Sequence, residues 1–237
     1  MVSNGCVVTM KRVKSMYFQS NYKRLLFTLL IAVLLATLPS IASGLASSDQ
    51  QICDIRADYA LGLEDYWAAI ALHRHFLVSH NKNALAHYHL GFAYGMVGDE
   101  TKEICEYLEA LKLGLHEWDL FLNLGIAYLS REQASEAIAA LQMAALSAPE
   151  HPEVHFELAI AYERAGRLSK ALQQIATSLR LKPRDPDQLN EEALIYAKLG
   201  ERDSARNVWA RLAITYPNYS PARLNLQILN SSDWSQF

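Results

Sequence analysis

The chain has 237 residues, of which 51% are apolar and 20% charged, a composition typical of folded proteins that excludes a wholly disordered chain. Its formal net charge is −3. Beyond residue 46 the charge becomes −8, because residues 1–46 hold five of the 22 basic residues and none of the 25 acidic ones. An acidic body argues against nucleic acid or an anionic membrane surface as the main partner.

The N-terminal segment, residues 1–46, is predicted to direct export. Residues 1–24 hold all five of its basic residues, and residues 25–38 are almost entirely apolar. A basic n-region followed by an apolar h-region is typical of a secretory signal peptide. The n-region is long, and Met16 is an alternative to Met1 as the true start.

Two fates of the apolar segment remain open. Small residues at Ser40 and Ala42, or at Gly44 and Ala46, fit a signal-peptidase site, so cleavage would release a periplasmic or secreted protein. Alternatively, the weakly apolar continuation makes residues 25–46 long enough for the roughly 20 residues of a bilayer helix. The chain would then stay anchored in the inner membrane, and the preceding positive charge would still place its body outside the cytoplasm.

Beyond residue 50 the sequence is organised by a period of 34 residues. A window started at Ala84 and moved in steps of 34 meets the same residue types each time, which marks an architecture of stacked repeats. The eighth position is small and the eleventh is tyrosine, at Gly91, Gly125, Ala159 and Ala193 and at Tyr94, Tyr128, Tyr162 and Tyr196. The fifteenth position holds Gly98, Glu132, Gly166 and Gly200. A degenerate copy, in which fewer of these residue types are kept, begins at Gln50.

Each repeat is predicted to form two amphipathic helices. Its apolar residues follow a three-four spacing, as in Phe121, Leu124 and Tyr128 and then in Ile138 and Leu141. Small residues at the eighth and twentieth positions let the two helix axes approach closely. Glycine at the fifteenth position supplies the left-handed residue that ends the first helix.

Two helix starts carry predicted caps. Asp185 precedes Pro186 and Ser220 precedes Pro221, so each capping side chain stands before a proline at the first helical position. Residues 220–230 are then predicted to form a last helix with a solvated outer face, as the open end of a stack requires.

This pattern closely resembles the tetratricopeptide repeat over residues 50–219. The resemblance implies an all-α fold, a right-handed α-α superhelix (solenoid) of about five helix pairs with a C-terminal capping helix. The implied repeats are 50–83 (degenerate), 84–117, 118–151, 152–185 and 186–219, followed by the capping helix 220–230 and a tail, 231–237. Trp118 to His151 is the clearest copy and the centre of the stack.

No enzymatic motif is present. The sequence has no phosphate-binding loop, no CxxC, no HExxH and no nucleophile elbow, so we expect neither an enzyme nor a cofactor. Histidines crowd residues 73–89, but the His-x-His pairs lie on opposite helix sides. His73 and His87 are therefore predicted to be hydrogen-bonded packing residues, and no metal site is expected. His151 and His155 have ligand spacing, but Pro152 begins the helix between them.

Three further residues break the pattern. Glu103 occupies the small twentieth position and is predicted to reach towards solvent, with a contact to His87 or to a partner as the alternative. Cys53 and Cys105 fall on non-adjacent helices, so they are predicted to be free thiols, buried or half-buried, rather than a disulfide.

In the tetratricopeptide family the first helices line a concave groove that binds peptides or helices. The matching positions here combine an apolar strip with an acidic rim: Tyr88, Phe92, Asp119, Leu122, Asn123, Ile126, Glu153, Phe156 and Ile160. Acids stand where family members that bind a C-terminal carboxylate carry lysine, so that mode is disfavoured. An exposed apolar strip favours an apolar or amphipathic protein segment as partner. The alternative is that these residues pack inward or lie beneath the chain's own tail.

The resulting hypothesis is an exported scaffold that binds a protein or peptide and supports assembly of an envelope complex. The first place to look for the partner is the free side of residues 118–151, formed by Asp119, Leu122, Asn123 and Ile126. The alternative is an oligomerisation module, tethered to the membrane through residues 25–46, whose repeats self-associate.

Overall fold

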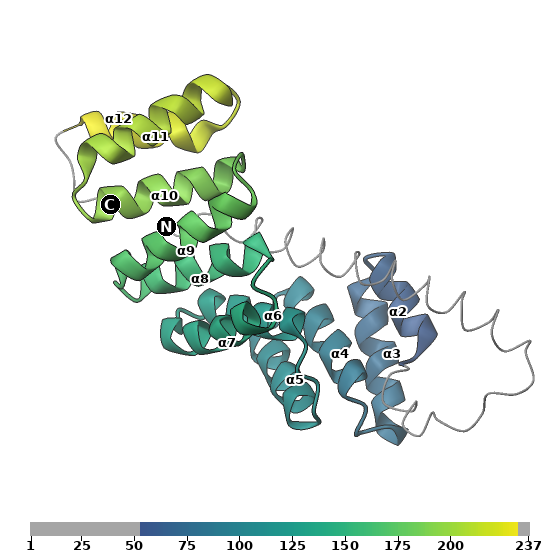
Figure 1. The fold of residues 1–237 in the computed structure, drawn as a ribbon. Coiled ribbons are helices and arrows are strands. Elements are labelled where there is room, and N and C mark those ends of the chain that lie inside the picture. Colours follow the sequence, from purple (N-terminus) through teal and green to yellow (C-terminus); the bar gives the residue numbers. More distant parts are fainter. Residues whose placement is uncertain (1–52, 232–237) are drawn as a thin grey trace, which may run out of the picture. The chain divides into compact units, whose positions relative to one another are not determined.

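The computed structural model describes residues 53–231, which contain helices and no strands (Figure 1). The helices are α2 (Ile55–Gly62), α3 (Tyr66–Ser79), α4 (Ala84–Val97), α5 (Glu100–Lys112), α6 (Trp118–Ser130), α7 (Ala134–Ser147), α8 (Pro152–Arg164), α9 (Leu168–Leu181), α10 (Pro186–Lys198), α11 (Arg202–Thr215) and α12 (Ser220–Asn230). The predictions for residues 1–46 and for the tail beyond Ser231 lie outside the described residues. None of the described helices is both long and apolar enough to cross a bilayer.

The helices follow the 34-residue period. α4, α6, α8 and α10 begin at Ala84, Trp118, Pro152 and Pro186, which are the starts of the four clear copies. The degenerate copy supplies α2, which has 8 residues where α4 has 14. The all-α prediction is confirmed, and the start of the first helix could be read from the sequence in the four clear copies, whereas α2 begins at Ile55 rather than at Gln50.

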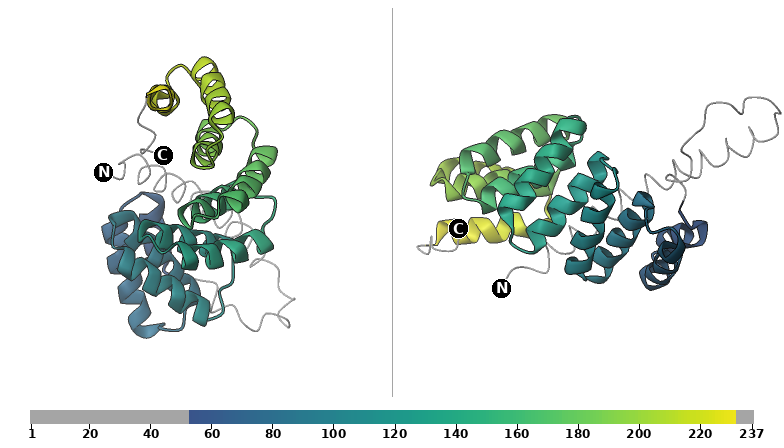
Figure 2. Two further views of the ribbon diagram at one scale, coloured as in Figure 1. Left: turned by 90° about the vertical axis from the view of Figure 1, so that its left-hand side faces the viewer. Right: turned by 90° about the horizontal axis from the view of Figure 1, so that it is seen from below.

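The chain divides into two compact units. The first ends at Arg131 and the second begins at Glu132, so the division falls inside the predicted repeat 118–151. Within the first unit, α2 to α6 pack in consecutive order, and within the second, α7 to α12 do the same, as both views of Figure 2 show. Each unit is therefore a row of antiparallel helices that bury one another's apolar faces.

The core of the first unit depends on glycine at the eighth position of α4. Tyr107 of α5 is fully buried, and its ring lies over Gly91. A Cβ atom at Gly91 would come within 2.7 Å of the Tyr107 Cδ1 atom, closer than packed carbon atoms approach. The small residue thus makes room for the ring between the two helices.

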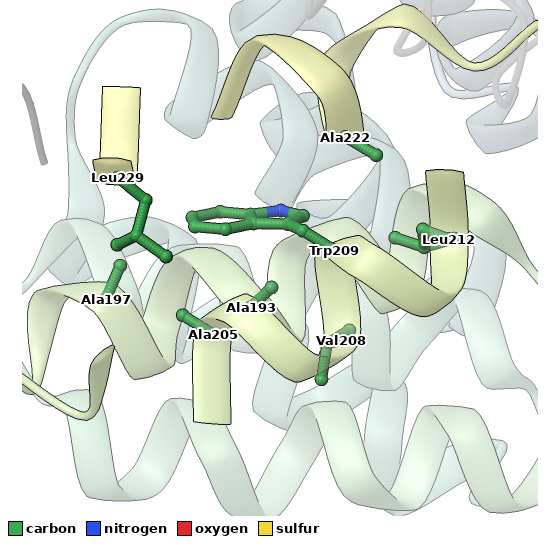
Figure 3. Packing of buried hydrophobic residues seen from close by; sticks show 8 residues of the cluster. All are labelled: Ala193, Ala197, Ala205, Val208, Trp209, Leu212, Ala222 and Leu229. Atoms are coloured by element: carbon green, nitrogen blue, oxygen red, sulfur yellow. The ribbon is translucent and has the colours of Figure 1, made fainter. Parts of the chain in front are cut away.

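The core of the second unit is centred on Trp209 of α11. Its indole is fully buried, and small or aliphatic side chains from α10, α11 and α12 surround it (Figure 3). The buried neighbours are Ala193, Ala197, Ala205, Val208, Leu212, Ala222 and Leu229. Alanine on α10 leaves space for the ring, and α12 closes the core from its other side.

The first helices end in a left-handed residue, as predicted. Gly98 and Gly166 have φ angles of 86° and 69°. Glu132 and Glu64 stand at the same repeat position and adopt φ angles of 60° and 61°. The turn geometry is therefore kept even where glycine is absent, at an energetic cost that a Cβ atom imposes.

One predicted cap forms and the other does not. The Asp185 side chain accepts hydrogen bonds from the backbone of Asp187 and Gln188 at the start of α10. Ser220, however, is the first residue of α12, and Tyr219 occupies the cap position without a side-chain hydrogen bond to the helix. The prediction for Ser220 is wrong because the helix begins one residue earlier.

Candidate partner-binding surface

The predicted groove residues on α4 and α6, in the first unit, are buried. Tyr88 and Phe92 of α4 and Leu122 and Ile126 of α6 are all buried, with at most 5% of their surface exposed. The prediction of an exposed apolar strip is therefore wrong for these four residues. α6 packs against α4 and α5, and the apolar side chains are withdrawn from water.

Aromatic packing holds the two α4 residues inside. The Tyr88 ring lies 5.8 Å from the ring of Tyr107, and the Phe92 ring meets the Tyr66 ring edge to face at 6.4 Å, both measured between ring centroids. Such pairs add to the free energy of burial. These side chains contribute to the interior of the first unit.

Asp119 and Asn123 form a buried polar network with Tyr88. Asn123 donates from Nδ2 to the Tyr88 hydroxyl oxygen at 2.9 Å, and the Tyr88 hydroxyl is hydrogen-bonded to Asp119. Burial and the Asp119 charge raise the pKa of Tyr88 well above its ordinary value, and burial raises the pKa of Asp119. The side of residues 118–130 that was predicted to be free is therefore an interior network.

The predicted groove residues of the second unit are half-buried rather than fully buried. Glu153, Phe156 and Ile160 lie three and four residues apart on α8, share one side of the helix, and are all half-buried. Glu163 extends this row by a further turn and forms an ion pair with Lys198 of α10. The two first helices are thus joined at one end by a salt bridge. We call the row on α8, together with Glu191 and Leu194 of α10, the α8–α10 face.

The α8–α10 face is acidic and partly withdrawn from solvent. Burial, reinforced by the nearby charge of Glu163, raises the pKa of Glu191 to about 7. Burial also raises the pKa of Glu153. A carboxylate in this setting is stabilised by an approaching cation, because the cation replaces the water that burial has removed.

Asn190 of α10 does not contribute to the α8–α10 face, because its side chain is hydrogen-bonded to α11 and α12. Its Oδ1 atom accepts hydrogen bonds from Trp209 Nε1 at 2.9 Å and from Asn225 Nδ2 at 3.0 Å. The fifth position of this repeat is consequently used to bind α11 and α12 to α10. The apolar residues of the face on α8 are Phe156 and Ile160, whereas Leu194 of α10 packs against the core around Trp209.

Glu103 does not reach solvent, so that prediction is wrong. Its side chain is 1% exposed, and its carboxylate lies directly over Gly95 of α4. His87, the alternative contact, instead places its Nδ1 atom 2.6 Å from Glu106 Oε2. The missing side chain at Gly95 creates the space that the carboxylate occupies.

The histidines divide into two kinds. His87 and His155 have hydrogen-bonding neighbours at both ring nitrogens: His155 Nδ1 lies 2.8 Å from Gln174 Oε1, and Nε2 lies 2.8 Å from Pro149 O. The packing prediction is confirmed for His87. His73 is fully buried, yet neither ring nitrogen has a hydrogen-bond partner within the described chain, so the prediction of a hydrogen-bonded His73 is wrong.

Sequence reasoning missed the surroundings of Cys53. Both described cysteines are free, but Cys105 is exposed, which the prediction did not allow, whereas Cys53 is buried beside Asp58 and His89. One signal was available: Asp58 occupies the ninth position of its repeat, where the other copies carry an apolar residue. These three side chains are potential metal ligands and are taken up below.

Comparisons with known proteins agree with the helical arrangement. Two family models described as tetratricopeptide repeat match residues 122–186 and 192–219. No curated protein sequence matches the chain. Among solved structures, YrrB, described as a TPR protein with an unusual peptide-binding site, is 23% identical with a TM-score of 0.67, over 72% of this chain and 88% of its own.

Two structures of MamA are similar in the same way. One is 22% identical with a TM-score of 0.63, over 68% of this chain and 94% of its own. The other, from Desulfovibrio magneticus RS-1, is 15% identical with a TM-score of 0.67, over 74% of this chain and 99% of its own. At these identities the likeness shows the fold.

The consecutive helix pairs define an α-helical repeat protein. With the two matching family models, the chain is a tetratricopeptide-repeat protein. Proteins of this class are typically scaffolds for protein interactions.

Proposed function

We propose that the α8–α10 face binds an amphipathic protein segment that carries basic residues. The observation that carries the proposal is that Phe156 and Ile160 are half-buried in one row with the carboxylate of Glu153. Apolar side chains of a partner would cover Phe156 and Ile160, and its cations would approach Glu153, since Glu163 is already paired with Lys198. Charge complementarity of this kind sets the orientation and speed of association.

The test uses two labelled helical peptides of equal apolar content, one with lysine and one with glutamate on its polar face. We expect the lysine peptide to bind the purified full chain and the glutamate peptide not to bind. Phe156→Lys and Ile160→Lys should each weaken binding by about tenfold or more, since central apolar contacts carry most of an interface's affinity.

The matched control is Ile214→Lys. Ile214 lies on α11 and is 81% exposed, so its replacement adds the same charge to the same unit away from the face. It should leave peptide affinity unchanged. Equal binding of both peptides, or equal loss in Ile160→Lys and Ile214→Lys, would contradict the proposed surface.

We further propose that the scaffold is exported and supports assembly of an envelope complex. The support is the basic and apolar pattern of residues 1–46, which suits a cleaved signal or an inner-membrane anchor. Fusion of this segment to alkaline phosphatase, which is active only outside the cytoplasm, tests export. An inactive fusion that is produced in full would refute it, and the size of an active fusion separates cleavage from anchoring.

Self-association is a second candidate, favoured by an exposed stripe on α2. Ile55, Tyr59 and Leu63 stand four residues apart and expose 65%, 59% and 62% of their surface. A stripe of this kind, running from α2 to the cap residue Leu63 at the first helix of the described residues, suits a second copy of the chain. Sedimentation of the full chain should show a dimer that Tyr59→Lys converts to a monomer. A wild-type monomer at all concentrations rules this candidate out.

A further inference from the structure

Three potential metal ligands meet inside the first unit, and a fourth group, His73, lies beside one of them. Cys53 precedes α2, Asp58 lies on α2, and His89 lies on α4; each is at most 7% exposed. Their ligand atoms all lie within 4.8 Å of one another. His73 of α3 adds a fourth group, with its Nε2 atom 3.6 Å from Asp58 Oδ1. Three helices and the segment before them thus converge on one point.

The arrangement is not that of an activated nucleophile. In a Cys-His-Asp triad, the cysteine and the carboxylate meet opposite nitrogens of the imidazole ring. Here Cys53 Sγ and Asp58 Oδ1 lie 3.3 Å and 2.7 Å from the same nitrogen, Nδ1 of His89.

An ordinary buried hydrogen-bond network does not explain His73 either. Buried polar atoms in folded proteins nearly always have partners, as both ring nitrogens of His155 do in the second unit. Neither ring nitrogen of His73 has one within the described residues, although the side chain is fully buried.

The ligand set and its spacing suit zinc. One sulfur, two imidazole nitrogens and one carboxylate oxygen are the donors that Zn²⁺ takes in tetrahedral sites. Metal–ligand bonds of about 2.0–2.3 Å place neighbouring donors roughly 3.3–3.7 Å apart. The Cys53–His89 and His73–Asp58 separations of 3.3 Å and 3.6 Å fall in this range, and the 2.7 Å contact would widen as the metal replaces the proton shared by His89 and Asp58. His73 lies outside the group of ligand atoms that are within 4.8 Å of one another, so its ring would move towards the metal on binding.

We propose that Cys53, Asp58, His73 and His89 form a buried zinc site that fastens α2 to α3 and α4. α2 has only 8 residues, and the helix row of the described chain begins with it. A thiolate and a carboxylate balance the charge of the cation, so the site is neutral when loaded. The metal would add a link between these helices to the packing of the buried residues of α2.

The test uses the full chain, produced without an affinity tag and purified in a mild detergent that retains residues 25–38. After removal of metals with a chelator, the chain is titrated with Zn²⁺ and, separately, with Co²⁺ as a spectroscopic probe. We expect one metal ion per chain and a Co²⁺ spectrum with tetrahedral d–d bands and a thiolate-to-metal charge-transfer band. A wild-type spectrum without the charge-transfer band would overturn the proposal.

Variants test each ligand against a matched residue. Cys53→Ser and His73→Leu should lower zinc affinity by about 100-fold or more, because even groups that only orient ligands contribute up to that amount. Cys105→Ser and His75→Gln alter exposed residues of the same types and should leave affinity unchanged. Equal affinity in Cys53→Ser and wild type would also overturn the site. The wild-type cobalt spectrum decides the question even if His73→Leu does not fold.

Discussion

The two units use the same repeat positions differently. In the first unit, α4 and α6 bury the residues at their fifth and ninth repeat positions, such as Tyr88 and Ile126. In the second unit, the same positions of α8, Phe156 and Ile160, are half-open beside carboxylates. A residue's place in the repeat therefore determines which side of its helix it occupies, while its neighbours decide whether that side is interior or surface.

The helix termini differ in the same sense. In the first unit, side chains cap the starts of α2, α3, α4 and α5, at Asp54, Asp65, Asn83 and Asp99. Of the described helices in the second unit, only α10 has a side-chain cap, at Asp185. Each cap contributes about 1 kcal/mol to helix stability. The first unit thus depends more on local hydrogen bonds, and the second more on its core around Trp209.

The largest expected effect tests this dependence on Trp209. Trp209→Ala should lower the free energy of unfolding by about 3–5 kcal/mol, because it removes a fully buried aromatic side chain and leaves a cavity. Hydrogen exchange followed by mass spectrometry should show faster exchange in α10, α11 and α12 than in α4 and α5. Trp67→Ala is the control, since Trp67 is 71% exposed, and equal losses in both variants would contradict the comparison.

The next effect concerns the eighth position, which is glycine in α4 and alanine in α10. Gly91→Ala should cost about 1–3 kcal/mol, because its Cβ atom would collide with the buried Tyr107 ring. Ala193→Gly should cost about 1 kcal/mol through lost helix propensity. Thermal denaturation measures both. A Gly91→Ala variant as stable as wild type would show that the Tyr107 ring can shift and that the first unit is less tightly packed than described.

Local features of the fold could be predicted from the sequence, and contacts between repeats could not. The helix starts and the left-handed residue at Gly166 depend on residues a few positions apart, so a single repeat contains the necessary signal. The burial of Asn123 depends on Tyr88, 35 residues earlier in the chain. His89 of α4 contacts Asp58 of α2, which lies 31 residues earlier and on the far side of α3 in the sequence. Contacts between residues so far apart in the sequence depend on helix packing angles, which the periodicity does not specify.

The third effect concerns Glu191 of the α8–α10 face, whose raised pKa should make the free energy of unfolding depend on pH. The pKa of Glu191 is about 7 in the folded chain, whereas the unfolded chain has the ordinary glutamate pKa of 4.5. Below pH 4.5 both states keep the proton. Between 4.5 and 7 only the unfolded chain releases it, so the cost to folding grows over this window and is constant above it.

Glu191→Gln removes that ionisation while keeping the shape of the side chain. It should raise the free energy of unfolding by about 1–3 kcal/mol at pH 8 and have almost no effect at pH 4, as measured by urea denaturation. Glu136→Gln alters an exposed acid of α7 and should change stability by less than about 0.5 kcal/mol at both values. An equal gain from Glu191→Gln at pH 4 and pH 8 would contradict the raised pKa.

The smallest effect lies at the fifteenth repeat position, where the two units should agree. Glu64 in the first unit and Glu132 in the second adopt left-handed backbone angles that cost a non-glycine residue about 1–2 kcal/mol. Glycine removes this strain but has more freedom in the unfolded chain, so Glu64→Gly and Glu132→Gly should each gain about 0.5–1 kcal/mol. Gly166→Ala should lose a similar amount, since no atom lies within 4 Å of the added Cβ and only the backbone resists it. Because the backbone strain is local, the two glycine variants should gain equal free energies of unfolding, as measured by urea denaturation. A gain in only one of them would mean that packing between helices also constrains this turn.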